Sequence, residues 1–302
     1  MKKLIEYIKS ESIGEYKENV SFKTLTTYRT GGSASLVVYP KSIDGLKVLI
    51  KFIKDNNIDF KIFGNGSNIL ASDKDYDGVI IKLTKLNHFR ILFNRLYIES
   101  GASLMGISNT LCKSGYSGFE FACGIPGTIG GAIYMNAGAY LEDISRVLIS
   151  VKVLDLNDLS IKKINNKKLG FKYRHSILQE NNNYIILSGV FKIKKGNRGK
   201  ILKLIVERKQ RRVETQPLEY PSAGSVFRNP LDNYAGKLIE DCNLKGFKKG
   251  GAEISDKHAN FIINKDNATS QDIKDLMDLV HDTVKEKYDV DLIREQELFN
   301  WE

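Results

Sequence analysis

The segment GIPGTIGGAIYMNAGAY, which runs from Gly124 to Tyr140, restricts the possible fold of this chain more than any other feature. It contains five glycines in seventeen residues, interrupted by one proline and by apolar residues. A flexible linker would be polar, and the interior of a helix or strand would contain much less glycine. The segment therefore indicates a backbone that approaches another group so closely that side chains would not fit.

A second glycine-rich loop, Gly64–Asn68, follows a predicted strand over residues 60–63. Its two glycines allow positive φ angles, and successive N–H groups in such a turn can surround an anion. Neither segment has the spacing of a P-loop or of a Rossmann fingerprint. The two loops together suggest a large ligand with a phosphate-bearing spine, such as a dinucleotide, whereas the second loop alone would also be compatible with an ordinary turn.

The chain has 302 residues and a formal net charge of +10, with basic residues concentrated at 162–175 and 192–212. Nucleic-acid binding is one interpretation of this charge. We favour the interpretation that most basic residues lie on solvated surfaces and that a few bind an anionic ligand. Neither interleaved aromatic and basic residues nor a helix-turn-helix signature stands out in the sequence. We therefore expect no nucleic-acid partner.

The start of the chain does not resemble an export signal, because Glu6, Lys9 and Glu11 interrupt its apolar positions. No apolar run approaches the roughly 20 residues of a membrane span. The three cysteines are widely separated, which argues against a disulfide framework or a zinc site. We therefore expect a cytoplasmic chain with no membrane association and no bound metal.

The apolar periodicity predicts an α+β fold without regular βαβ alternation. Residues 1–20 are expected to form an amphipathic helix followed by a polar connection, and a domain boundary is expected near residue 197. Further helices are predicted over residues 42–57, 103–115, 198–213, 235–241 and 270–288. Strands are predicted over residues 60–63, 79–83, 90–93, 96–99, 147–156, 160–164, 184–194, 260–264 and 292–299.

Seven blocks, in the same order along almost the whole chain, resemble the UDP-N-acetylenolpyruvoylglucosamine reductase (MurB) family. Each block is longer than a generic motif. They are TTYRTGGSA (26–34), IFGNGSNIL (62–70), GIPGTIGGAIYMNAGAY (124–140), FKYRHSIL (171–178), QPLEYPSAGSVFRNP (216–230), AGKLIEDCNLKGFKKGGAEISDKHANFIIN (235–264) and REQEL (294–298).

The resemblance implies a flavin-binding domain of the vanillyl-alcohol-oxidase/PCMH type over residues 1–197, with two α+β subdomains that divide near residues 85–100. A C-terminal α+β substrate-binding domain would follow over residues 198–302. The implied activity is NADPH-dependent reduction of a UDP-sugar enolpyruvyl ether through non-covalently bound FAD, in peptidoglycan precursor synthesis. We expect a monomer. Another FAD-dependent oxidase or dehydrogenase of the same superfamily is the alternative, and a basic nucleic-acid-binding protein is a more distant one.

Three residues match catalytic positions of the family. Arg174 in YRHS matches an arginine, whose planar fork suits a carboxylate. Ser225 in AGSVF matches the proton donor, and Glu297 in REQEL matches an acidic residue. Glu295 and Glu297 are alternate residues of a predicted strand and would share a face, so Glu295 remains an alternative.

The resemblance also implies binding residues. Those expected to hold the cofactor are Tyr28, Arg29, Gly31, Gly32, Gly64, Asn65, Gly66, Ser67, Asn68, Gly124, Pro126, Gly127, Thr128, Gly130, Gly131, Asn136 and Ala137. Those expected to hold the UDP-sugar are Tyr220, Arg228, Asn229 and Lys237.

The chain departs from the family's pattern in two places. Some members carry an inserted loop after the catalytic arginine, with a tyrosine that stacks over the nucleotide. Only about fifty residues separate Arg174 from Ser225, so this chain resembles the loop-lacking (type II) subclass. In addition, Gln296 stands where a proline is usual.

Overall fold

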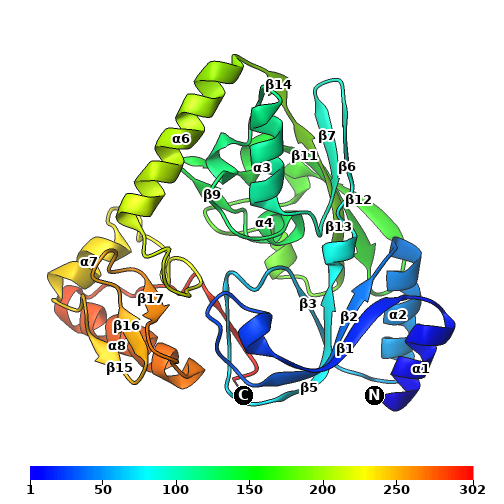
Figure 1. The fold of residues 1–302 in the computed structure, drawn as a ribbon, viewed down its shortest axis with the longest axis horizontal. Helices are drawn as coiled ribbons and strands as arrows, with labels where there is room; N and C mark the ends of the chain where they lie inside the picture. Colours follow the sequence, from blue (N-terminus) through cyan, green and yellow to red (C-terminus); the bar gives the residue numbers. More distant parts are fainter. Residues whose placement is uncertain (302) are drawn as a thin grey trace. The chain divides into compact units, whose positions relative to one another are not determined.

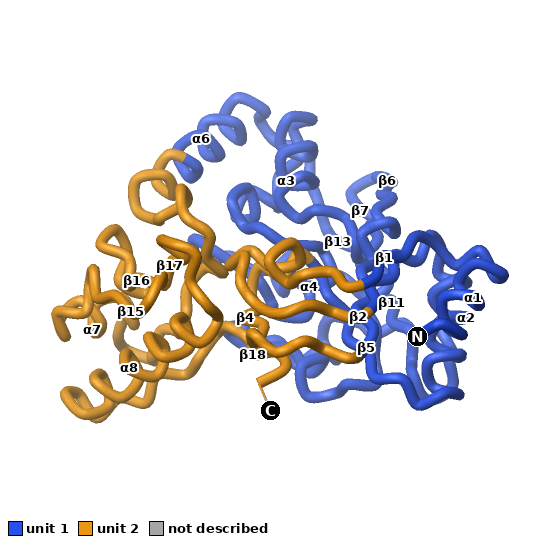
Figure 2. Tube along the Cα trace, turned by 60° about the horizontal axis from the view of Figure 1, so that its bottom comes forward, with its two compact units in different colours: residues 1–18, 36–64, 78–209 blue, residues 19–35, 65–77, 210–302 orange. Residues whose placement is uncertain are grey.

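The computed structural model describes residues 1–301, and the chain divides into two compact units (Figure 2). Unit 1 consists of residues 1–18, 36–64 and 78–209. Unit 2 consists of residues 19–35, 65–77 and 210–302. Each unit is therefore assembled from segments that lie far apart in the sequence.

The first sheet, most of whose residues lie in unit 1, has the strand order β1-β2-β5-β3 (Figure 1). β3 and β5 are parallel, with Phe63 opposite Lys82. The strands are β1 (Gly14–Ser21), β2 (Ser33–Pro40), β3 (Phe60–Phe63) and β5 (Tyr76–Lys82).

Helices α1 (Lys2–Ser10) and α2 (Ile43–Asp55) supply the apolar side chains that cover one face of this sheet. Helix α2 begins where the sequence predicts, because the Ser42 side chain accepts a hydrogen bond from the Gly45 amide at 3.0 Å. Its buried leucines and isoleucines share a core with Val79 and Ile81 of β5. The opposite faces of β3 and β5 are therefore turned away from the helices.

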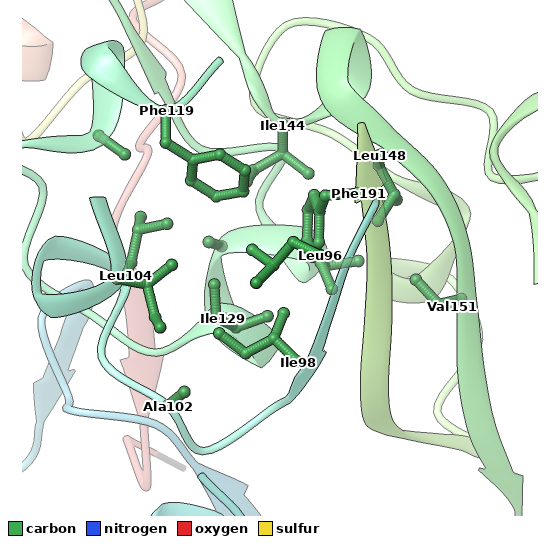
Figure 3. Close-up of a cluster of buried hydrophobic side chains, with 14 of the residues drawn as sticks. Leu96, Ile98, Ala102, Leu104, Phe119, Ile129, Ile144, Leu148, Val151 and Phe191 are labelled. Atoms are coloured by element: carbon green, nitrogen blue, oxygen red, sulfur yellow. The ribbon is translucent and has the colours of Figure 1, made fainter. Parts of the chain in front are cut away.

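The second sheet of unit 1 has the strand order β12-β11-β13-β7-β6. Its strands are β6 (Phe89–Leu92), β7 (Arg95–Glu99), β11 (Leu148–Asp155), β12 (Ile161–Asn165) and β13 (Tyr184–Lys192). Side chains from α3 (Leu104–Lys113) and α4 (Ile129–Tyr134) share a core with this sheet, and Figure 3 shows Leu104 and Ile129 beside Leu96 and Ile98 of β7.

Shorter elements complete unit 1, and α6 runs from it into unit 2. They are β8 (Tyr116–Ser117), β9 (Gly138–Ala139), β10 (Glu142–Asp143), α5 (Ile144–Val147), β14 (Lys194–Lys195) and α6 (Arg198–Thr215). Single 3-10 turns lie at Leu83–Lys85, Glu120–Ala122, Asn166–Lys168 and Ile177–Gln179.

Unit 2 contains a three-stranded antiparallel sheet, β15-β16-β17, and a parallel pair formed by β4 and β18. Helix α8 contributes Ile273, Leu276 and Met277 to the core that this unit builds. The elements are β4 (Ile69–Ala71), α7 (Ala235–Asp241), β15 (Lys248–Lys249), β16 (Ala252–Ile254), β17 (Ile262–Asn264), α8 (Ser270–Tyr288) and β18 (Glu297–Phe299), with a 3-10 turn at Phe22–Thr24.

Two inserted segments from the N-terminal part of the chain are integral to unit 2. The Asp73 carboxylate accepts hydrogen bonds from the Ser270 and Gln271 amides, each at 3.0 Å, at the start of α8. Tyr28 is fully buried in the unit 2 core, and its hydroxyl donates to Gln296 Oε1 at 2.8 Å. These contacts explain why residues 19–35 and 65–77 group with the C-terminal part.

The α+β class is confirmed, and most predicted helices and strands are present. Three expectations differ from the structure. The expected polar connection before residue 20 contains β1, a largely exposed strand at the sheet edge that shows no apolar alternation. The glycine-rich segment contains α4, and the last predicted strand is reduced to β18, because residues 292–296 run beside 226–228 instead.

The predicted domain boundary near residue 197 stays a prediction. That position lies in unit 1, immediately before α6. No helix of the described residues is both long enough and apolar enough to cross a membrane.

We expect the substitution Asp73→Ala to lower the free energy of unfolding by about 1–2 kcal/mol, because two amides at the start of α8 lose a charged acceptor. Urea denaturation monitored by circular dichroism measures this loss. Asp232→Ala is the matched control, since Asp232 is exposed in a loop, and it should change stability by less than about 0.5 kcal/mol. Equal stability of the two variants would contradict the role of Asp73.

Candidate active site

The two glycine-rich loops meet in unit 1 at Gly64 and Thr128. A Cβ atom added to Gly64 would lie 2.7 Å from the Thr128 hydroxyl oxygen, which is too close for any real side chain. Thr128 also caps α4 by accepting a hydrogen bond from the Gly131 amide at 3.3 Å. The two loops therefore approach each other at these residues, and a side chain at position 64 would force the Thr128 side chain to move.

Two glycines of the long segment, Gly130 and Gly127, have local causes. Gly130 donates its amide proton to the Ser100 carbonyl at 2.8 Å, and an added Cβ would lie 3.0 Å from Ser100 Cβ. Gly127 has a φ of 140°, a conformation that favours glycine. Much of the glycine content therefore permits backbone-on-backbone contact within the chain itself.

The loop that follows Gly64 continues in unit 2 and carries amides suited to an anion. Gly66 has a φ of 64°, and an added Cβ would collide with the Leu25 carbonyl oxygen. Within residues 1–301, the amides of Asn65 and Gly66 donate no hydrogen bond. Successive amides without acceptors are what a bound phosphate group would use, so this loop fits a flavin dinucleotide.

The expected cofactor residues near position 30 lie in unit 2. Tyr28 is engaged through its hydroxyl with Gln296, as described above, and burial strongly raises its pKa. Gly31 and Gly32 allow close passage of the 71–74 main chain, because an added Cβ would lie 3.1 Å from the Ser72 oxygen and 2.6 Å from the Lys74 oxygen, respectively. Arg29 is exposed.

Asn136 and Ala137 support the chain around them. The buried Asn136 side chain accepts from the Ser145 amide at 3.0 Å and donates to the Lys172 carbonyl at 2.9 Å. The Ala137 amide donates to the Ala132 carbonyl at 2.9 Å. Asn136 therefore holds the start of the turn that presents Arg174.

Arg174 occupies a tight turn in which Lys172 and His175 exchange two backbone hydrogen bonds of 3.1 Å. Its φ of 54° lies in the left-handed region, which costs a residue with a side chain about 1–2 kcal/mol. One guanidinium nitrogen donates to the Gly138 carbonyl at 2.8 Å, and the Gln179 side chain donates to the Arg174 carbonyl at 3.2 Å. Strain of this kind, held by surrounding contacts, is common at functional sites.

Ser225 lies half-buried in a loop of unit 2 that Gln296 supports. The Gln296 side-chain amide donates to the carbonyls of Ala223 at 3.2 Å, Gly224 at 3.1 Å and Ser225 at 3.4 Å. Its oxygen accepts from Tyr28. One buried side chain thus links the loop of Ser225 to an N-terminal segment of the same unit.

Asn260 holds the next residues of that loop. Its side-chain oxygen accepts from the Phe227 amide at 2.9 Å, and its side-chain nitrogen donates to the Phe227 carbonyl at 2.8 Å. Its own carbonyl accepts from the Val226 amide at 2.9 Å. Ser225 is therefore flanked on its C-terminal side by a fixed backbone.

Glu297 and Arg228 also belong to unit 2. The Glu297 side chain is accessible, yet removal of water from its carboxylate by the surrounding protein raises its pKa, an effect that the positive charge of Arg228 opposes. The Nε atom of Arg228 has no hydrogen-bond partner among the described residues. Glu295, the alternative acid, is half-buried, and its amide donates to the Val226 carbonyl at 2.8 Å.

The other expected substrate residues vary in their surroundings. The Asn229 side chain accepts from the Ala235 amide at 3.1 Å, next to the start of α7. Lys265 lies 4.6 Å from the centre of the Tyr220 ring. Lys237 is exposed and forms an ion pair of 2.9 Å with Asp241 one helical turn away.

Sequence reasoning missed the supporting roles of Gln296 and Asn260. A signal for Gln296 was present, because residues alternate across a strand and Gln296 separates two glutamates that face the other way. Asn260 precedes an apolar strand, and no pattern in the sequence indicates that it binds the Phe227 main chain.

Comparisons with known proteins match two parts of the chain to family models. Residues 34–163 match the family model described as an FAD binding domain. Residues 216–299 match the model of the UDP-N-acetylenolpyruvoylglucosamine reductase C-terminal domain. The chain therefore has the expected order of a flavin-binding domain followed by the C-terminal domain of that family.

Similar proteins extend along nearly the whole chain. The UDP-N-acetylenolpyruvoylglucosamine reductase of Bacillus pumilus is 43% identical and aligns over 99% of this chain and 100% of its own length. That of Clostridium novyi is 45% identical over 92% of this chain and 90% of its own length. The crystal structure of the Thermus caldophilus reductase, 30% identical, covers 94% of this chain and 100% of its own with a TM-score of 0.82. The chain belongs to the UDP-N-acetylenolpyruvoylglucosamine reductase family.

Proposed function

We propose that this chain reduces UDP-N-acetylglucosamine enolpyruvate to UDP-N-acetylmuramate with NADPH, as a step of peptidoglycan precursor synthesis. The observation that carries the proposal is similarity to reductases of this name over 99% of the chain, at 43% identity in one case. The reaction adds a hydride and a proton across the enolpyruvyl double bond. We place this activity in the cytoplasm and assign it to a monomer.

FAD is the proposed cofactor, bound without a covalent link. When bound, it supplies a carrier that takes a hydride from NADPH and passes it to the substrate. The main chain of the Gly64–Asn68 and Gly124–Gly131 loops would hold its diphosphate. The unpaired amides of Asn65 and Gly66 support this assignment.

Arg174 is proposed to bind the substrate carboxylate. Negative charge grows on this carboxylate as the hydride arrives, and a permanently charged guanidinium stabilises it where it develops. The turn of Arg174 supports this role, because Asn136 and Gln179 fix its main chain and the Gly138 carbonyl orients the guanidinium before substrate binds.

Ser225 is proposed to donate the proton to the carbon next to the carboxylate. A serine hydroxyl is a weak acid, but the carbanion-like carbon is a strong base. A general acid must be held within hydrogen-bond reach of its target. The bonds from Gln296 and Asn260 to the Ser225 loop support such fixed placement.

Glu297 is proposed to stabilise the developing charge through a protonated or hydrogen-bonded carboxyl group. Its raised pKa supports this role, because it favours the neutral form that can donate a hydrogen bond. Tyr220, Arg228, Asn229 and Lys237 are proposed to bind the UDP-sugar, whose diphosphate would use part of the positive charge.

The purified chain tests the activity as a whole. We expect a yellow protein that oxidises NADPH in repeated turnovers only when the enolpyruvyl substrate is present, and a product heavier than the substrate by two hydrogens in mass spectrometry. A flavin-loaded protein that oxidises NADPH at the same rate without this substrate would contradict the proposal and would favour another flavin oxidase.

We expect Ser225→Ala to separate the two half-reactions. Stopped-flow absorbance should show nearly normal flavin reduction by NADPH and a slowing of about 10²–10⁴-fold in reoxidation by substrate, because only the second step needs the proton. Ser222→Ala in the same loop should keep both rates. Similar losses in both half-reactions of a normally folded Ser225→Ala protein would contradict the assignment.

Glu297→Gln should reduce the oxidative half-reaction by about 10²–10³-fold while stabilising the chain at neutral pH. A carboxyl group whose pKa is raised by folding stabilises the folded chain at pH values below its pKa in the unfolded chain. This contribution is lost as the pH rises through its pKa in the folded chain. The melting temperatures of wild type and variant, measured without cofactor, should therefore converge near about pH 4 and favour the variant at about pH 8.

Glu295→Gln serves as the comparison for this experiment. It removes the neighbouring carboxylate from the same part of the chain. If Glu295→Gln loses the oxidative half-reaction and Glu297→Gln retains it, then Glu295 is the acid and the assignment of Glu297 is wrong.

A further inference from the structure

Lys82, the last residue of β5, is a buried cation that the proposed reaction does not use. Its side chain is 9% exposed. Within residues 1–301, its ammonium group takes part in no hydrogen bond, ion pair or cation–π contact. A charge in a largely buried residue without a partner is costly, and here burial lowers the pKa of the lysine with no opposing contribution from a nearby charge, although the Nζ atom is not completely removed from solvent.

An ordinary explanation would be a lysine whose stem crosses apolar surface to bring its ammonium to water. Lys61 on the neighbouring strand β3 is exposed and fits that description. The position of Lys82 differs, because Val79 and Ile81 point into the core that includes α1 and α2. Side chains alternate along a strand, so Lys82 points to the other face of the sheet.

The surroundings of Lys82 resemble a ligand site of parallel sheets, in which ligands bind beyond the carboxyl ends of the strands. Lys82 lies opposite Phe63 in the parallel pair of β5 with β3, and both strands end there. Phe63 is followed by Gly64, whose missing side chain admits Thr128. Lys82 thus lies at the strand end at which the two glycine-rich loops meet in unit 1.

Glycines keep the neighbouring main chain close to this position. An added Cβ on Gly101 would collide with the carbonyl oxygen of Leu83, the residue after Lys82. Ser100, next to Gly101, accepts the Gly130 amide hydrogen bond at 2.8 Å. The main chain at Leu83, Gly101 and Gly130 is therefore closely packed beside the strand that ends at Lys82.

We propose that Lys82 binds an anionic group of the flavin cofactor. The inference rests on the proposed function, since it requires that the chain bind FAD. Two groups have the necessary charge, namely the diphosphate and the isoalloxazine ring after reduction. Either would supply the counter-charge that the described residues do not provide.

The test compares Lys82→Met with the control Lys61→Met, which removes an exposed lysine from the same sheet. Without FAD, Lys82→Met should have a higher melting temperature than wild type, because an unpaired buried charge is replaced by an apolar side chain of similar length. Fluorescence titration of the FAD-free proteins then gives the affinities for FAD and for riboflavin, which lacks the diphosphate.

If the partner is the diphosphate, Lys82→Met should weaken FAD binding about tenfold or more and leave riboflavin binding unchanged. If the partner is the reduced ring, the affinity for oxidised FAD should persist, and the reduction potential of the bound flavin should become more negative. Lys61→Met should match wild type in melting temperature, flavin affinity and reduction potential.

The inference is overturned if Lys82→Met matches wild type in both FAD affinity and reduction potential. It is also overturned if the variant without FAD is less stable than wild type, since Lys82 would then have a structural partner. These outcomes differ from failure of the proposed function, in which the wild-type chain itself binds no FAD or does not reduce the enolpyruvyl substrate.

Discussion

Close packing against glycines near the ends of β3 and β5 is the constraint on which unit 1 depends. Gly64 admits Thr128, Gly130 packs on Ser100, and Gly101 lies against the Leu83 carbonyl. Any side chain at these positions would force the segments apart. The same strand ends carry the charge of Lys82, for which no partner is found among residues 1–301, and a site for an anionic dinucleotide requires such a charge.

Unit 2 relies on buried polar side chains instead. Gln296 and Asn260 bind five main-chain groups around Ser225, counted as the carbonyls of residues 223, 224, 225 and 227 and the amide of residue 227. A loop rich in small residues has little intrinsic order, so these hydrogen bonds supply the rigidity that a proton donor in this loop would need. Such networks are effective only when every member is satisfied, and the Tyr28 hydroxyl completes the bonding of Gln296.

The sequence allowed the α+β class, the pairing of the glycine loops and the family to be predicted, because periodicity, glycine spacing and long motifs are local signals. It did not reveal α4, since Gly130 and Gly131 are poor helix formers whose helix is stabilised by burial of Ile129 and Ile133. The roles of Gln296 and Asn260 depend on partners about 30 to 270 residues away, so strand alternation could indicate the side that Gln296 faces but not the groups that it binds. The three catalytic assignments remain predictions from the motif match.

The central claim is that the glycine-lined strand ends of unit 1 form the cofactor site. A crystal structure of the full chain with FAD tests it most directly. The account predicts that the diphosphate lies against the main chain at Gly64 and Thr128, with an anionic group of the cofactor in contact with the Lys82 ammonium. A cofactor whose diphosphate touches neither loop would contradict the account.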